Sequence, residues 1–205
     1  MEAYITVIIA AYVIGSINFA VIISRKIAGF DVREKGSKNA GTTNILRTVG
    51  KKAAIITLLC DILKGVVAVL IAILVKYIWK DINVQTLKYL AGIAVIIGHT
   101  YPIFFEFRGG KGVATSIGVL LMLNWKIGLI CLIFGLIVIA ITKMVSLGSM
   151  TGAVLFPIIS IFMQENIKFI QVILCFFITA IVIFNHRTNI KRLKEGKENK
   201  LSFKK

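Results

Sequence analysis

Three polar segments interrupt an otherwise apolar chain, and the first of them carries residue types that bind anions. This segment, Glu34–Arg47, combines glycines, hydroxyls, carboxamides and cations within fourteen residues. Glycine lets backbone N–H groups face a phosphate, hydroxyl and amide groups donate further hydrogen bonds, and an arginine guanidinium matches two phosphate oxygens. The segment can therefore wrap an anion, although a flexible loop that only sets membrane topology would have the same composition.

The second segment, Gly98–Thr115, places a glycine cluster directly before an apolar stretch that predicts a helix. A helix start offers N–H donors and a partial positive charge, and Lys111 adds a full charge. The segment is not a Walker A loop, because Gly112 follows the lysine where that motif needs Ser or Thr. We therefore expect a phosphate here but not a nucleotide.

Three further ionisable residues lie in or beside apolar runs. His99 precedes a Tyr-Pro break, where it could act as a base or could satisfy backbone groups that the break exposes, and we favour the structural role. Asp61 and Lys64 are three residues apart and so share a helix face, at a position where isolated charge is costly. We expect them to pair and to support the first polar segment rather than to react.

The third polar segment, Asn185–Glu198, follows the last apolar run. One interpretation is a basic tail, about residues 186–205, that binds anionic lipid. However, His186 and Asn189 are three apart and would share a helix face at the membrane surface. From there they could meet the other two segments.

The elements that must position these residues are membrane helices. The 205 residues are 58% hydrophobic, with a mean hydropathy of +0.89, which exceeds what a soluble domain of this length can bury. Tyr4–Ile23 has no basic residue before it and no clear cleavage site, so we interpret it as a retained span and not as a signal peptide. The later apolar runs are Ala53–Val75, Leu87–Phe105, Val113–Leu123, Ile127–Thr142, Ser149–Met163 and Phe169–Phe184.

The pattern predicts an all-α integral membrane protein with seven transmembrane helices, some short or tilted, in a single polytopic domain over residues 1–205. The stretch from Arg25 to Lys52 between the first two runs is expected to be a loop. Alternate connections hold 19 and five Lys and Arg residues, which places the N-terminus outside and the C-terminus in the cytoplasm. All three polar segments then face the cytoplasm.

The net charge of +16 is explained by this topology, so we do not expect nucleic acid as a partner. Cys60, Cys131 and Cys175 lie in three different apolar stretches without ligand spacing. They are expected to pack in the apolar interior, and we predict no metal site.

Together the three segments resemble the three cytoplasmic motifs of the bacterial PlsY glycerol-3-phosphate acyltransferases, and the resemblance extends over the whole chain. Asp61–Gly65 is also similar to the family, whereas Lys38 stands where many relatives have glycine. The matching residues are Gly36–Asn44 with Arg47, Gly98–Pro102 with Gly109–Thr115, and Asn189–Leu193 with Gly196 and Glu198.

The resemblance implies transfer of a fatty acyl group from a long-chain acyl phosphate to the 1-hydroxyl of glycerol 3-phosphate. The products are lysophosphatidic acid and inorganic phosphate, in the first step of phospholipid biosynthesis, without coenzyme A, carrier protein or any cofactor. It also implies a multi-pass protein of the bacterial inner membrane with its active site on the cytoplasmic face. Membrane lipid is an expected partner, and a soluble enzyme that produces acyl phosphate is a candidate one.

The resemblance also implies roles for individual residues. The catalytic set, which binds glycerol 3-phosphate, is Ser37, Arg47, Lys111, His186 and Asn189. The donor head group is expected on the Gly109–Thr115 loop, with a hydroxyl from Ser146 or Ser149. The wider substrate-binding set is Asn39, Gly41, Asn44, Gly109, Gly110, Gly112, Thr115, Ser146 and Ser149, with Asp61, Lys64 and His99 as structural support.

The proton of the attacking hydroxyl is expected to pass to a phosphate oxygen of the donor itself. Neither His99 nor His186 is followed four residues later by Asp, the pattern of acyltransferases that use thioesters.

Two other classes of protein have some of the same features. A transporter of a phosphorylated metabolite would combine several spans with basic pockets, but its site should lie near the membrane midplane and not in segments at one end. A lipid-binding scaffold would account for the basic tail but would give Lys111 no function.

Overall fold

The computed structural model describes residues 1–201, and helices are its only regular secondary structure over that range. The chain divides into two compact units, Met1–Leu123 and a second unit that begins at Asn124. The single polytopic domain expected from the sequence stays a prediction.

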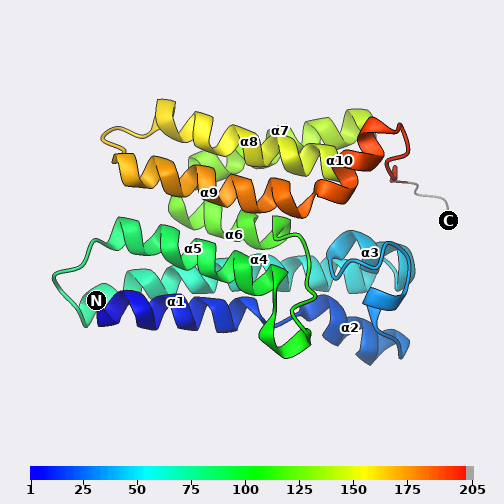
Figure 1. The fold of residues 1–205 in the computed structure, drawn as a ribbon, viewed down its shortest axis with the longest axis horizontal. Coiled ribbons are helices and arrows are strands. Elements are labelled where there is room, and N and C mark those ends of the chain that lie inside the picture. Colours follow the sequence, from blue (N-terminus) through cyan, green and yellow to red (C-terminus); the bar gives the residue numbers. More distant parts are fainter. Residues whose placement is uncertain (202–205) are drawn as a thin grey trace. The chain divides into compact units, whose positions relative to one another are not determined.

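The first unit is a bundle of long helices with short ones at one end, as Figure 1 shows. Helix α1 packs along α5, and α4 packs along both α5 and α6. The elements are α1 (Glu2–Gly15), α2 (Phe19–Ala28), η1 (Val32–Glu34), α3 (Thr42–Thr48), α4 (Lys51–Leu74), η2 (Val75–Tyr77), α5 (Val84–Thr100), η3 (Ile103–Phe105) and α6 (Val113–Leu123).

Glycines allow these helices to approach closely. A side chain on Gly15 would collide with the carbonyl of Val95, and one on Gly98 would collide with the carbonyl of Tyr12. Between α4 and α6, a side chain on Gly118 would likewise collide with the carbonyl of Ile62. Small residues at helix contacts are the usual means of packing in lipid, where apolar side chains gain little by leaving the solvent.

The second unit consists of α7 (Trp125–Thr142), α8 (Val145–Met163), α9 (Phe169–Asn185) and α10 (Arg187–Lys194). A side chain on Gly148 would collide with the carbonyl of Gly135, which brings α8 close to α7. The Thr179 hydroxyl of α9 donates to the Ala153 carbonyl of α8 at 2.7 Å. Helix α10 bends by 60° from α9, so the chain turns where its basic tail begins.

The all-helical membrane fold predicted from the sequence is confirmed, but a count of seven crossings is not. Five helical stretches in residues 1–201 are long and apolar enough to span a bilayer, and the number is six if bent α9–α10 is counted as one span. All seven predicted runs consist mainly of helix, yet α6 has only 11 residues, too few to cross alone. The first span runs from Glu2 to Ala28, longer than expected, with a break between α1 and α2.

The expected loop from Arg25 to Lys52 contains more helix than its composition indicated. It includes the end of α2, the η1 turn, all of α3 and the start of α4. These pieces are short because glycines at positive φ end or separate them, as Gly29 (φ 71) does after α2 and Gly50 (φ 123) does before α4. The folded pieces give the first polar segment a defined shape.

Candidate functional site

Asn44 organises the first polar segment. It lies in α3 with 1% of its surface exposed. Its amide nitrogen donates to the carbonyls of Val32, Lys35 and Asn39 at 3.0 to 3.1 Å, and its side-chain oxygen accepts the N–H of Ser37 at 2.9 Å. Because both donors and the acceptor of the carboxamide are engaged, Asn44 is suited to shape the loop that presents Ser37.

The other sequence-predicted residues of this segment are more accessible. Ser37 and Arg47 are exposed, and Asn39 and Gly41 are half-buried. Lys38 has φ 58, in the left-handed region that glycine enters without steric cost. The backbone conformation therefore gives a physical reason for the glycine that we expect at this position in relatives.

A pair of buried charges, just before the first polar segment, ties that part of the chain to the second segment. Arg33 makes several hydrogen bonds to Asp31, the shortest at 2.8 Å, and also donates to the carbonyl of Phe105 at 2.8 Å. Arg25, at the end of α2, reaches the same Asp31 carboxylate at 2.9 Å. Burial alone would raise the pKa of Asp31, but the bonds from Arg33 and Arg25 outweigh it and lower the pKa to about 2. Sequence reasoning did not single out this cluster, because Arg33 and Phe105 are 72 residues apart.

The second polar segment is held against the end of α5 by its backbone. The N–H groups of Gly109 and Gly110 donate to the carbonyls of Thr100 and His99 at 3.0 and 3.1 Å. A side chain on Gly110 would collide with Nε2 of His99 and would come within 2.6 Å of the Ala40 carbonyl oxygen. The two polar segments of this unit therefore lie side by side, in contact at Gly110 and Ala40.

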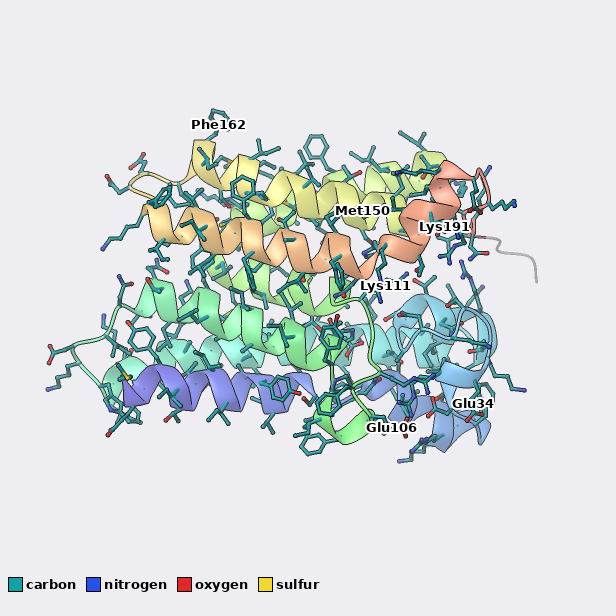
Figure 2. The ribbon with its side chains drawn as sticks, in the orientation of Figure 1. Glu34, Glu106, Lys111, Met150, Phe162 and Lys191 are labelled. Atoms are coloured by element: carbon teal, nitrogen blue, oxygen red, sulfur yellow. The ribbon has the colours of Figure 1, made fainter. Side chains whose placement is uncertain are left out.

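This glycine loop leads directly into α6. Gly112 has φ 84, and the first bond of the helix is from Ser116 N–H to the Gly112 carbonyl at 2.7 Å. The N–H groups of Val113, Ala114 and Thr115 consequently have no carbonyl within α6 to which they can donate. Lys111 is half-buried immediately before them, where Figure 2 labels it. The helix start thus combines N–H donors with a cation, as the sequence predicted.

Asp61, Lys64 and His99 form a buried cluster beneath these segments. Each of the three side chains is at most 4% exposed. Lys64 Nζ lies 3.1 Å from Asp61 Oδ1, so the predicted pairing is present, and His99 Nδ1 lies 3.5 Å from the same oxygen. Lys64 also donates to the carbonyls of Gly15 and Ile17 at 2.9 Å, at the break between α1 and α2.

In the second unit the candidate residues gather around one carboxylate. Glu198 accepts hydrogen bonds from the Ser146 hydroxyl at 2.9 Å, the Asn189 amide at 2.7 Å and the Arg192 side chain at 2.9 Å. Burial would raise the pKa of Glu198, but these three partners together hold it below its ordinary value. The sequence points to Glu198 only through the family resemblance and not as a site residue.

Two further candidates of this unit differ in their surroundings. The Ser149 hydroxyl donates to the Val145 carbonyl at 2.8 Å within its own helix. His186, at the bend between α9 and α10, places Nδ1 2.8 Å from the Val182 carbonyl oxygen. A carbonyl can only accept, so in the neutral ring Nδ1 carries the proton and Nε2 is the acceptor.

Each unit therefore brings together its own part of the predicted set. The first unit holds Ser37, Asn39, Gly41, Asn44, Arg47, Gly109, Gly110, Lys111, Gly112 and Thr115 on its two polar segments. In the second unit, Ser146 and Asn189 bond to one carboxylate, Ser149 lies on α8, and His186 lies between α9 and α10.

Known proteins similar to this chain form one consistent group. Residues 5–196 match the family model described as glycerol-3-phosphate acyltransferase. A protein of that name from Clostridioides difficile is 47% identical over 205 residues, covering 99% of this chain and 98% of its own length. Another from Thermoanaerobacter is 46% identical, covering 100% and 98%.

Solved structures agree with the sequence comparisons. The chain is similar to a crystal structure of PlsY (YgiH), an integral membrane glycerol 3-phosphate acyltransferase, in its glycerol 3-phosphate form, with a TM-score of 0.87 and 34% identity. That match covers 97% of this chain and 96% of the other. A lysophosphatidic acid form of the same protein matches with a TM-score of 0.84 and 32% identity, covering 97% and 95%.

Proposed function

Because this chain belongs to the glycerol-3-phosphate acyltransferase family, we propose that it transfers a fatty acyl group from acyl phosphate to the 1-hydroxyl of glycerol 3-phosphate. The products are 1-acyl-glycerol 3-phosphate and inorganic phosphate, which makes this the first step of phospholipid biosynthesis. The observation that carries the proposal is the glycine loop 109–112, which is packed against His99 and carries Lys111 just before the start of α6.

The loop supplies what a phosphate of the donor requires. The first N–H groups of α6 provide hydrogen bonds and a partial positive charge for this phosphate, and Lys111, which we assign to glycerol 3-phosphate, provides a full charge beside them. Glycines are needed at 109 and 110 because a Cβ at either position would collide with neighbouring atoms of the α5 end. Ser37 and Arg47, on the adjacent segment, are assigned to the phosphate of glycerol 3-phosphate.

The chemistry needs little more than position and charge. The hydroxyl oxygen of glycerol 3-phosphate attacks the acyl carbonyl, a C–O ester bond forms, and the C–O bond to phosphate breaks. The proton of the hydroxyl passes to an oxygen of the departing phosphate, so no protein base is required. An acyl phosphate is an activated mixed anhydride, and holding two anions close together is the main task of the protein.

We extend the substrate-binding role to His186, Asn189 and one hydroxyl of Ser146 or Ser149 in the second unit. Their resemblance to the third family motif supports this assignment. The local geometry favours Ser146, because it shares Glu198 with Asn189, whereas Ser149 bonds within its own helix. Ser146 and Asn189 would then be oriented as a pair by one carboxylate.

Asp61, Lys64 and His99 are proposed to position the site without touching substrate. Lys64 holds the α1–α2 break, and Asp61 lies between Lys64 and the His99 ring against which Gly110 packs. Movement in this cluster would be transmitted to the glycine loop through contacts between packed atoms. A structural histidine is consistent with a reaction whose proton leaves with phosphate.

The excess of Lys and Arg in alternate connections supports placing the polar segments on the cytoplasmic side of the bacterial inner membrane, with the N-terminus outside. Glycerol 3-phosphate would then arrive from the cytosol, and the acyl chain of the donor would lie in lipid. A soluble enzyme that produces acyl phosphate is the corresponding candidate partner.

The experiment uses purified protein with palmitoyl phosphate and glycerol 3-phosphate. We expect release of inorganic phosphate that requires both substrates, and Lys111→Ala and Arg47→Ala should each reduce it at least a hundredfold while the protein remains folded in detergent. Phosphate release without glycerol 3-phosphate, or uptake of glycerol 3-phosphate into sealed vesicles without turnover, would contradict the proposal. The second outcome would favour a transporter.

A further inference from the structure

The hairpin between α5 and the glycine loop, residues Tyr101–Arg108, exposes apolar side chains at a place where the proposed acyl transfer does not need them. Ile103 is 51% exposed, Phe104 60% and Phe107 56%. Figure 1 shows the hairpin in green, projecting sideways from the first unit near the junction of α1 and α2. A group of large apolar side chains that extends from a protein in this way indicates a binding surface.

Several backbone N–H groups of the hairpin form hydrogen bonds within the protein. The N–H groups of Phe105 and Phe107 donate to the Pro102 carbonyl at 3.1 and 3.0 Å, and Arg108 N–H donates to the Phe105 carbonyl. The Ile103 N–H donates to the Ser16 hydroxyl at 3.4 Å. Hydrogen bonds of this kind lower the cost of bringing non-helical backbone to the edge of the membrane, where an unsatisfied polar group is expensive.

Neighbouring elements supply two further bonds to the hairpin. The Tyr12 hydroxyl of α1 donates to the Tyr101 carbonyl at 2.9 Å, and Arg33 donates to the Phe105 carbonyl at 2.8 Å. The hairpin is therefore fixed to α1 on one side and to η1, just before the first polar segment, on the other. These bonds hold the hairpin in the conformation in which its apolar side chains are exposed.

Two consecutive residues of the hairpin adopt a strained backbone. Glu106 has φ 58 and Phe107 has φ 55, in the left-handed region that residues with a Cβ enter only at a cost. Phe107 is an unusual residue for that region. Strain of this kind persists only where the surrounding structure enforces it, and here it accompanies exposure of an aromatic ring.

The charges of the hairpin are arranged for an interface rather than for bulk lipid. The Glu106 carboxylate lies 3.9 Å from nitrogens of both Arg33 and Arg108. On α1, the apolar side chains Ile9 and Val13 are exposed as well. The hairpin is bonded to this end of the first span through Tyr12 and Ser16, so its apolar residues lie beside a helix with exposed apolar side chains, and charged groups adjoin them.

We propose that the Tyr101–Arg108 hairpin is an interfacial anchor whose partner is the lipid of the bilayer: Ile103, Phe104 and Phe107 enter the outer part of the acyl layer, while Glu106 and Arg108 stay at the headgroups. Aromatic and apolar side chains with adjoining charge are suited to this boundary. Because Gly109 and Gly110 follow at once and are bonded to the end of α5, the anchor also sets the depth of the glycine loop in the membrane.

Depth-dependent fluorescence quenching tests the anchor without reference to activity. Trp79 and Trp125 are replaced by Phe, Phe104→Trp is introduced, and the protein is placed in vesicles of phospholipid brominated at shallow or deep acyl positions. We expect at least twofold quenching, stronger from shallow bromines. The matched control is Glu34→Trp, since Figure 2 shows Glu34 farther than Glu106 along the long axis of the first unit, and it should be quenched less. Equal quenching of the two, or none at Phe104→Trp, would overturn the proposal.

A second measurement rests on the proposed acyl transfer, and its outcomes distinguish a failure of the anchor from a failure of that reaction. Phe104→Ser with Phe107→Ser should lower phosphate release in vesicles about threefold or more while leaving the rate in detergent micelles unchanged, because micelles impose no fixed depth. Tyr77→Ser is the control, since Tyr77 is 79% exposed in η2 and should affect neither rate. If phosphate release fails altogether but the quenching is present, the reaction is wrong and the anchor stands. An equal loss in vesicles and micelles would contradict the anchor.

Discussion

The polar ends of the two units are built in different ways. In the first unit, glycine backbone is packed against His99 and Ala40, and the helix beneath carries a buried Asp61–Lys64 pair. In the second unit, Ser146, Asn189 and Arg192 are joined only by their side chains to one carboxylate near the end of the described chain. The first arrangement leaves no space for a Cβ at Gly109 or Gly110, whereas the second depends on the ionisation of a single group. The two ends should therefore respond to different perturbations.

The largest effect is expected from breaking the buried pair in the first unit. Lys64→Met leaves the Asp61 carboxylate without its ammonium partner and leaves the carbonyls of Gly15 and Ile17 without a donor. Loss of one partner of a buried pair costs about 3 to 5 kcal/mol of unfolding free energy. Thermal unfolding in detergent measures the change. Lys51→Met, at an exposed position of the same helix, should change stability by less than about 0.5 kcal/mol.

The next largest effect should come from adding one methyl group to the glycine loop. Gly110→Ala places a Cβ against His99 Nε2 and the Ala40 carbonyl oxygen, so the loop must shift away from the phosphate position. We expect phosphate release to fall about a hundredfold, since small misplacements at a reacting site have effects of that size. The assay is turnover with palmitoyl phosphate and glycerol 3-phosphate.

Gly29→Ala is the matched control for that substitution. Gly29 also lies in the first unit and has a positive φ of 71, but nothing lies within 4 Å of the position that a Cβ would take. The variant should lose roughly 1 kcal/mol of stability through backbone strain and keep its turnover rate. If both glycine variants kept wild-type turnover, tight packing at Gly110 could not be what places the loop.

The second unit should show a smaller effect that depends on pH. The pKa of Glu198 is lowered in the folded protein by Asn189, Arg192 and Ser146 against the opposing effect of burial. A lowered folded pKa gives stability that is fully present above the unfolded value, about 4.5, and that is lost as pH falls through the folded value. Glu198→Gln should therefore cost about 1 kcal/mol at neutral pH.

The pH dependence distinguishes a charge effect from simple loss of packing. The difference in stability between wild type and Glu198→Gln should shrink as pH falls below about 4.5. Unfolding in detergent followed between neutral pH and the lowest pH at which the protein stays soluble gives this difference. A difference that stays constant over the whole range would show that the carboxylate charge does not hold Ser146 and Asn189.

Whether the sequence predicts an interaction depends on how far apart the two residues lie in the chain. The Asp61–Lys64 pairing and the glycine loop before α6 involve residues a few positions apart, and both were predicted. The bond from Arg33 to Phe105 joins residues 72 positions apart, and the bond from Ser146 to Glu198 joins residues 52 apart. No local pattern encodes such partners, so these links were not anticipated.

The number of membrane crossings was also hard to predict, because one apolar run is too short to classify. The run Val113–Leu123 was recognised as apolar and short, and its bounds agree with α6. Hydropathy alone cannot tell whether an 11-residue helix crosses a membrane or stops within it. The break between α1 and α2 was also missed, because the side chain of Asn18 starts α2 by accepting from Val21 N–H inside a run whose high overall hydropathy outweighs its few polar residues.

The direct test of the central claim is the affinity of purified protein for glycerol 3-phosphate, measured by calorimetry in wild type, Lys111→Met and Lys126→Met. The claim is that Lys111 and the adjoining segment form one site for phosphate in the first unit. It predicts that Kd rises at least tenfold in Lys111→Met and stays unchanged in Lys126→Met, whose lysine follows the N-cap of α7. Unchanged affinity in Lys111→Met, with the protein folded, would contradict it.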